Sequence, residues 1–235
     1  MRRSGPCQAK SRHLTPRPCL PEYPSMADRL LLASASPRRR DLLNMMGIAF
    51  DALASDSDES IRAGLPAPLR VMALAEDKAR AVVNRPAAAA YAYILAADTL
   101  VWLQSGSGAE GAGDESSARV FGKPSDAADA RRTLEALSGR SHTVSTGLCL
   151  FRRRDSRFFK GRSDSLVHFA ALSPAEIDAA IANGDWKGVA GSYRIQGYAS
   201  RFIERIEGSW SGIVGLPIHE LYVMLGQADF DFSES

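Results

Sequence analysis

The stretch that most restricts the fold of this chain is a short apolar run followed at once by a helix start. Leu30, Leu31 and Leu32 are contiguous, as in a strand buried on both faces. Ser36 suits a helix N-cap, and Pro37 suits the first helical position. A buried strand that leads directly into a helix is typical of α/β proteins.

The remaining periodicity extends this pattern. Short apolar or alternating runs predict strands at 29–33, 48–53, 91–97, 99–103, 143–152, 157–171 and 201–206. Helical spacing of apolar residues predicts helices at 37–46, 66–84, 126–137, 174–183 and 217–225. Strands and helices alternate early and strands cluster later, which predicts a mixed α/β domain.

Composition limits the class of protein. The 235 residues suffice for one substantial domain, and a net charge of +2 provides no global basic field, so we expect no nucleic-acid partner. No apolar run is long enough to span a membrane, and we expect no membrane association. The three cysteines show no pairing pattern, which favours a reducing, cytoplasmic location.

The first residues differ from the rest of the chain. Residues 1–25 are proline-rich, lack hydrophobic periodicity and carry cations without an acid over the first 18 positions. We expect a disordered N-terminal extension at 1–25 and a single domain at 26–235. Two alternatives stay open: an organelle transit peptide, which the prolines fit poorly, or a true start at Met26.

Several segments resemble known binding motifs but lack features that those motifs require. GSGAEG at 106–111 matches GxGxxG, but no amphipathic helix follows to receive a pyrophosphate. FGKPSD at 121–126 lacks the first glycine and the hydroxyl residue of a Walker loop. The four histidines are scattered without metal spacing.

Carboxylates provide the first positive signal. Asp98 interrupts the apolar run YILAADTLVWL, where a carboxylate is costly unless it is paired, bound to metal or placed at a strand end beside a cleft. Catalysis and turn capping at a strand end are about equally favoured for Asp98. Glu59, with Asp56 and Asp58, either forms a solvated loop or supplies oxygen ligands for Mg²⁺.

Cations provide the second signal. Arginines 38–40 crowd the first turn of a predicted helix, where the helix dipole disfavours positive charge unless an anion binds there. Lys78 is either an ordinary surface lysine or a phosphate ligand, and Lys123 lies in a rigid GKP turn. With Asp98 and Glu59, these residues make up the set of groups that phosphoryl chemistry uses.

At this level of detail the chain resembles the Maf-like nucleoside triphosphate pyrophosphatases, from about Leu30 to about Leu225. Eight motifs occur in the family's order: SASPRRRDLL at 34–43, SDSDES at 55–60, LAEDKA at 74–79, AADT at 96–99, FGKP at 121–124, LSGRSHTVSTG at 137–147, AGSYRIQG at 190–197 and GSWSGIVGLP at 208–217. The resemblance implies an inosine triphosphate pyrophosphatase-like fold, with a long mixed sheet and flanking helices around a nucleotide cleft.

The resemblance also implies a reaction and its residues. A nucleoside triphosphate and water would give the monophosphate and pyrophosphate, with Mg²⁺ or Mn²⁺ as cofactor. Asp98 would act as general base and share the metal with Glu59. The phosphates would be bound by Arg38, Arg39, Lys78 and Lys123. Arg40 lies where the family varies, so we expect it to be solvated. The resemblance further implies a homodimer.

The resemblance also implies a substrate preference, which the family ties to three positions. Thr99, after the expected catalytic Asp98, and Gln196 in IQG match the branch that favours dTTP and UTP, and Arg38 is the third position. A glutamine amide can pair with the O4/N3–H edge shared by thymine and uracil; alternatively, Gln196 caps backbone. Other readings are a 7-methyl-GTP or modified-nucleotide pyrophosphatase, or a nucleotide-binding regulator of cell division with incidental hydrolysis. One departure is Val189, where the family often has lysine.

Overall fold

The computed structural model describes residues 29–56, 62, 64–104 and 118–232. The expected N-terminal extension at 1–25, together with Asp58 and Glu59, lies outside the described residues. The described strands, in chain order, are β1 (Leu30–Leu32), β2 (Phe50–Ala52), β3 (Tyr93–Leu103), β4 (Arg119–Phe121), β5 (Ser141–Arg152), β6 (Arg157–Phe169) and β7 (Ile203–Glu207).

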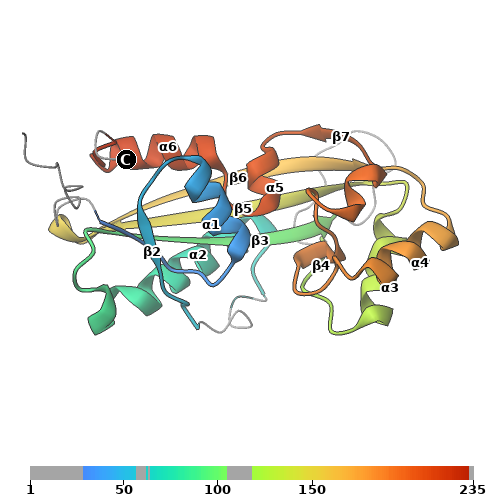
Figure 1. The fold of residues 1–235 in the computed structure, drawn as a ribbon, viewed down its shortest axis with the longest axis horizontal. Helices are drawn as coiled ribbons and strands as arrows, with labels where there is room; N and C mark the ends of the chain where they lie inside the picture. The colour runs from blue at the N-terminus through green and yellow to red at the C-terminus, as the bar shows by residue number, and fades with distance from the viewer. Residues whose placement is uncertain (1–28, 57–61, 63, 105–117, 233–235) are drawn as a thin grey trace, which may run out of the picture.

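These strands form one mixed sheet, as predicted. Its order is β2-β1-β3-β5-β6-β7, with β4 paired to β3 off this path. β2, β1 and β3 run parallel, and every other pairing is antiparallel. Figure 1 shows β3, β5 and β6 as long strands that run the length of the molecule. The hairpin between β5 and β6 turns at Arg153–Asp155, in the gap between the strands predicted at 143–152 and 157–171.

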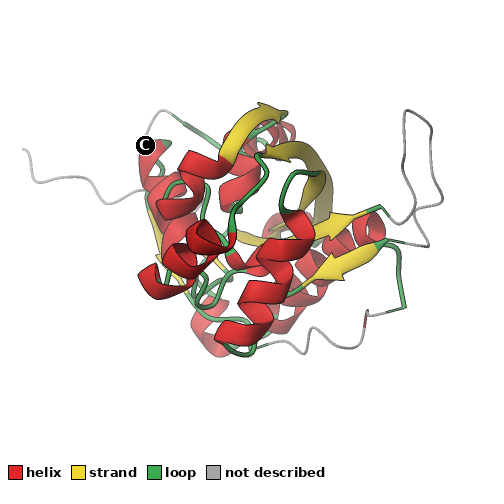
Figure 2. Cartoon of the chain, turned by 90° about the vertical axis from the view of Figure 1, so that its right-hand side faces the viewer, coloured by secondary structure: helices red, strands yellow, loops and turns green. Residues whose placement is uncertain are grey.

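Helices flank this sheet. The described α-helices are α1 (Pro37–Met45), α2 (Ala67–Val83), α3 (Ala127–Leu137), α4 (Pro174–Asn183), α5 (Trp210–Val214) and α6 (Ile218–Gln227). Short 3-10 turns lie at Pro86–Ala88 (η2), Arg153–Asp155 (η4), Ala190–Ser192 (η5) and Tyr198–Phe202 (η6). Figure 2 views the molecule from the end at which α3 and α4 lie, with helices in the foreground. No helix in these described ranges has the length and apolarity needed to cross a membrane.

One prediction about the strands is wrong. The break expected at Asp98 does not occur, because β3 runs unbroken through that residue, which pairs in register with Gly147 on β5. β4 and α5 were not predicted at all. Both are too short, at three and five residues, to show a clear hydrophobic period.

The two faces of the sheet carry separate cores near its parallel edge. Side chains alternate along a strand, so Leu30 and Leu32 face one way and Leu31 the other. Leu30 and Leu32 pack with buried residues of α1 and α6, whereas Leu31 packs with α2. Because both faces of β1 are buried, its sequence is continuously apolar.

A third core lies toward the other end of the long strands. Val101, Val144 and Val167 come from β3, β5 and β6 and pack against α3, α4 and the segment that follows α4. β3, β5 and β6 therefore contribute side chains to all three cores. Asp98 lies on β3 between Ala97 of the first core and Val101 of the third.

Gly147 controls how closely α2 approaches the sheet. A Cβ at this position would lie 2.7 Å from the backbone nitrogen of Met72 and closer still to the carbonyl group of Val71. Only glycine leaves room for the α2 backbone there. Since Gly147 is the register partner of Asp98, this close approach brings α2 directly against the strand that carries the carboxylate.

Candidate functional site

A cleft of about 470 Å³ opens where α1, β3 and the segment around η5 meet, within the size range of ligand pockets. Its charges are strongly unequal. The described lining residues with a charge are Arg38, Arg39, Lys78, Lys123 and Arg194 on the positive side and Asp56 and Asp98 on the negative side. Such an excess of cations suits a multiply charged anion.

The first turn of α1 forms one wall of this cleft. Ser36 is the N-cap by position, as predicted, but its side chain makes no capping bond, and its backbone nitrogen donates to Ser34 Oγ at 3.2 Å. Amides of a first helical turn have no intrahelical acceptor and carry partial positive charge. The residues from Ser34 to Arg39 all line the cleft, so these amides add to its affinity for anions.

Arg39 connects this wall to the rest of the site. Its Nε donates to Gly215 O at 2.8 Å, and its two terminal nitrogens donate to Ser34 Oγ at 3.1 Å and to Thr99 Oγ1 at 3.3 Å. Thr99 Oγ1 in turn lies 2.9 Å from Thr146 Oγ1. Arg39 therefore holds the α1 wall against β3 and the segment after α5, as well as lining the cleft.

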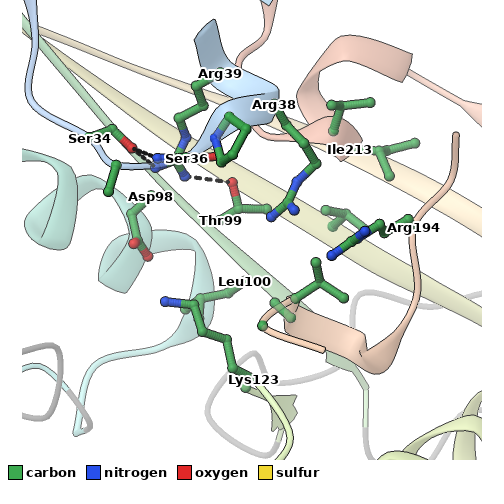
Figure 3. Close-up of a pocket in the computed structure, with 18 of the residues that line it drawn as sticks. Ser34, Ser36, Arg38, Arg39, Asp98, Thr99, Leu100, Lys123, Arg194 and Ile213 are labelled. Atoms are coloured by element: carbon green, nitrogen blue, oxygen red, sulfur yellow. Dashed lines mark hydrogen bonds between the residues drawn. The ribbon is translucent and has the colours of Figure 1, made fainter. Parts of the chain in front are cut away.

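Arg38 has a different environment. It is half-buried and has no hydrogen bond or ion pair with any residue that the structure describes. Burial, and secondarily the charge of Arg194, lower the pKa of its guanidinium. Figure 3 shows the side chain directed away from Arg39 and toward Arg194. Arg40 is exposed, in agreement with the expectation that it is solvated.

Asp98 and Lys78 form the centre of the site. The Lys78 ammonium pairs with Asp98 Oδ1, and the two side chains are only 10% and 6% exposed. Asp98 Oδ2 is buried and has no hydrogen-bond partner among the described residues. The alternatives of an ordinary surface lysine and of a strand-end aspartate are therefore wrong. Lys78 lines the cleft, but it contacts the carboxylate directly.

The other predicted residues also line the cleft. Lys123 follows β4, and Gln196 follows η5; both are exposed to solvent at the cleft. Thr99 is half-buried beside Asp98. The structure thus brings together all the predicted site residues except Glu59, which lies outside the described residues.

Arg194 is a cleft residue that sequence reasoning missed. It comes from the segment after η5, on the wall opposite α1 (Figure 3). The signal was present in AGSYRIQG, where an arginine stands two positions before Gln196. The chain turns there, with Gly197 N donating to Arg194 O at 3.0 Å. Tyr193 and Ile195 are buried, whereas Arg194 and Gln196 line the cleft.

Tyr193 supports the cleft wall that carries Arg194, from its buried side. Its hydroxyl lies 2.8 Å from His142 Nε2 on β5, and both rings are buried beside Phe169. Burial lowers the pKa of His142 to about 3 and raises that of Tyr193, so both groups are neutral near pH 7. The pair supports the backbone on which Arg194 and Gln196 lie.

The donor groups of the cleft are compatible with a divalent metal. The described residues contain no group of three or more His, Cys, Asp or Glu that could hold an ion alone. Mg²⁺, however, commonly uses one or two protein carboxylates together with substrate phosphates and water. Asp98 Oδ2, which has no partner among the described residues, and the carboxylate of Asp56 both lie in the cleft and fit that pattern.

Comparison with known proteins identifies the family. A family model described as Maf-like protein matches residues 29–228, which is most of the chain. This chain belongs to the Maf-like protein family.

Three proteins similar to this chain share one description. A relative from Anaeromyxobacter sp. (strain Fw109-5) is 43% identical over 207 residues, covering 86% of this chain and 91% of the relative. One from Cereibacter sphaeroides is 44% identical and covers 85% and 94%. One from Treponema denticola is 39% identical and covers 86% and 97%. All three are described as dTTP/UTP pyrophosphatases.

Proposed function

We propose that this chain hydrolyses nucleoside triphosphates to the monophosphate and pyrophosphate, with dTTP and UTP as preferred substrates. The relatives described as dTTP/UTP pyrophosphatases support this activity. The observation that carries it is a cationic cleft that contains a buried carboxylate, one oxygen of which has no partner among the described residues. A triphosphate satisfies the cations, and a water molecule beside Asp98 Oδ2 satisfies the carboxylate.

In the proposed reaction Asp98 is the general base. Lys78 holds Oδ1, which leaves Oδ2 to orient a water molecule and accept its proton. The water oxygen forms a bond to the α-phosphorus as the bond from that phosphorus to the bridging oxygen of the β-phosphate breaks. The bridging oxygen keeps the electron pair and leaves as part of pyrophosphate.

The cations of the cleft stabilise the charge that develops on pyrophosphate. Arg38, Lys123 and the first-turn amides of α1 would bind the phosphates, while Arg39 both binds and holds the wall in place. A divalent cation held by Asp98, Asp56 and Glu59 would neutralise phosphate charge and favour attack at phosphorus when bound. Gln196 would select the base through the O4/N3–H edge of thymine and uracil.

The decisive experiment is a panel of canonical and modified nucleoside triphosphates, incubated with Mg²⁺ or Mn²⁺ and followed by pyrophosphate release. We expect dTTP and UTP to be hydrolysed fastest. Asp98→Asn should retain nucleotide binding but lower kcat by roughly 10²–10⁴, the scale for loss of a general base. Near-normal turnover in that variant would refute the assignment of the base. Nucleotide binding without hydrolysis across the whole panel would favour a regulatory role instead.

A further inference from the structure

Two arginines face each other across the cleft, and no carboxylate lies between them in the described lining. Arg38 comes from the first turn of α1, and Arg194 comes from the opposite wall (Figure 3). The two charges are close enough for Arg194 to lower the pKa of Arg38. Like charges held together in a partly buried place are unfavourable unless an anion occupies the space between them.

The protein satisfies Arg194 only in part. One terminal nitrogen donates to Lys187 O at 3.1 Å, and the other lies 3.6 Å from Asp185 Oδ1. The other Asp185 oxygen accepts a stronger bond, at 2.7 Å, from the backbone nitrogen of Tyr198. Arg194 Nε is buried without an acceptor among the described residues. The side chain is therefore aimed by weak contacts and keeps donor capacity.

We propose that Arg194 is a substrate-binding residue and that, together with Arg38, it holds one phosphate group of the triphosphate from opposite walls of the cleft. This inference rests on the proposed function. A guanidinium binds phosphate through two parallel N–H···O bonds, and a phosphate has enough anionic oxygens to accept from both sides. In the view of Figure 3, Arg194 and Asp98 lie on opposite sides of the cleft, which fits a phosphate other than the one attacked.

The contact also connects phosphate binding to base selection. Arg194 and Gln196 lie two positions apart on one wall, anchored from below by Tyr193 and His142. A phosphate that bridges Arg38 and Arg194 would hold this wall against α1. Gln196 would then be positioned by the same anion that the catalytic residues act upon.

Inorganic tripolyphosphate tests the inference because it carries three phosphates and neither base nor sugar. Its affinity for the full-length chain is measured by calorimetry with Mg²⁺ present. We expect Arg194→Gln to raise the Kd roughly tenfold or more, as for loss of hydrogen bonds between charged groups. Arg40→Gln is the matched control, because it removes the same charge from an exposed site on α1. Its Kd should stay within about twofold of the wild type, since exposed charges are screened.

A double variant sharpens the test. If Arg38 and Arg194 contact one phosphate, Arg38→Gln and Arg194→Gln together should cost less than the product of their separate effects. Should Arg194→Gln lower the melting temperature, Arg194→Lys decides the matter, because it keeps the charge and removes the paired donors. A Lys variant that binds several-fold more weakly supports the two-sided contact, and one with wild-type affinity contradicts it.

Three other results would overturn the inference. Unchanged tripolyphosphate affinity in Arg194→Gln, with altered preference among dTTP, UTP and CTP, would mean that Arg194 reads the base. The wild-type chain could bind tripolyphosphate and hydrolyse nucleotides while Arg194→Gln binds tripolyphosphate as tightly as Arg40→Gln. That result would refute the Arg194 contact and leave the proposed function standing. A wild-type chain that neither binds tripolyphosphate nor releases pyrophosphate would instead refute the proposed function, and this inference with it.

Discussion

Lys78 and Asp98 form an ion pair that is buried between α2 and β3 at the cleft. Replacing the lysine by methionine leaves a buried carboxylate without its partner. Removing one member of a buried pair costs about 3–5 kcal/mol of unfolding free energy. We therefore expect Lys78→Met to be strongly destabilised in urea, and Lys78→Met/Asp98→Asn to recover much of the loss.

Arg80 on the same helix provides the control. It forms an exposed ion pair with Glu76, four residues earlier. Arg80→Met should lower the unfolding free energy by about 1 kcal/mol or less, the usual value for exposed pairs. A Lys78→Met protein as stable as Arg80→Met would show that the buried pair contributes little to folding.

The three arginines of α1 should respond differently to the same change. Arg39→Gln removes three hydrogen bonds, so we expect a loss of about 1–3 kcal/mol in unfolding free energy together with lower activity. Arg38→Gln should raise KM without lowering stability, since Arg38 has no partner among the described residues and its charge is disfavoured by Arg194. Arg40→Gln should be nearly silent in both measurements. Equal stability loss in Arg38→Gln and Arg39→Gln would contradict this division.

Gly147→Ala tests whether the close packing of α2 on the sheet depends on glycine at this position. The added methyl group would meet the backbone of Val71 and Met72, which cannot move aside like a side chain. Overpacking of this kind costs about 1–3 kcal/mol or more, and we also expect lower kcat because Lys78 would shift relative to Asp98. Gly161→Ala on the neighbouring strand is the control, because its methyl would meet only the end of the Met224 side chain at 3.0 Å. Similar effects of the two substitutions would rule out a special role for Gly147.

His142 should make the protein sensitive to acid. Its pKa is lowered to about 3 in the folded state by burial, against an ordinary value of 6.5. The unfolded chain therefore binds a proton that the folded chain excludes, so stability present above pH 6.5 is lost as the pH falls toward 3. From pH 7 to pH 5.5 this group alone should cost about 1 kcal/mol. Urea unfolding at pH 7 and pH 5.5 should show that the unfolding free energy falls less in His142→Gln than in the wild type. An equal fall in the two proteins would exclude His142 as the cause.

Gln196→Ala addresses the choice of base. If the amide pairs with thymine and uracil, its removal should raise KM for dTTP and UTP and reduce their advantage over CTP. Loss of a hydrogen bond to a neutral group corresponds to roughly fivefold to tenfold in kcat/KM. The measurement is kcat/KM for each nucleotide under identical metal conditions. Unchanged selectivity would favour the alternative in which Gln196 only caps backbone.

Much of the fold was predictable from local pattern, whereas the site was predictable only in part. α4 begins where the sequence predicted because Ser173 and Glu176 form a capping box, and it ends there because Gly184 adopts the left-handed conformation at the C-cap. The continuity of β3 was missed because the group that makes Asp98 tolerable there, Lys78, is supplied by α2 from 20 residues away. Pairing of that kind depends on packing, and no local signal reports it.

Residue type also proved a poor guide to what each cation contacts. Adjacent arginines look alike in the sequence, yet Arg39 binds protein groups while Arg38 is directed toward Arg194. The difference arises because Gly215 and Thr99, from distant parts of the chain, reach Arg39 only in the folded state. Arg194 was missed for the same reason, since only the fold brings it opposite α1.

The unbroken ladder between β3 and β5 has a mechanical consequence. Backbone pairing runs without a bulge from Tyr93 opposite Arg152 to Trp102 opposite Thr143, and Asp98 lies inside it. We expect a ladder of that length to resist bending, so that the two ends of the molecule do not hinge about the carboxylate. Bases of different size would then be accommodated by the walls, while Asp98, the proposed general base, would stay a fixed reference point against which each substrate is aligned.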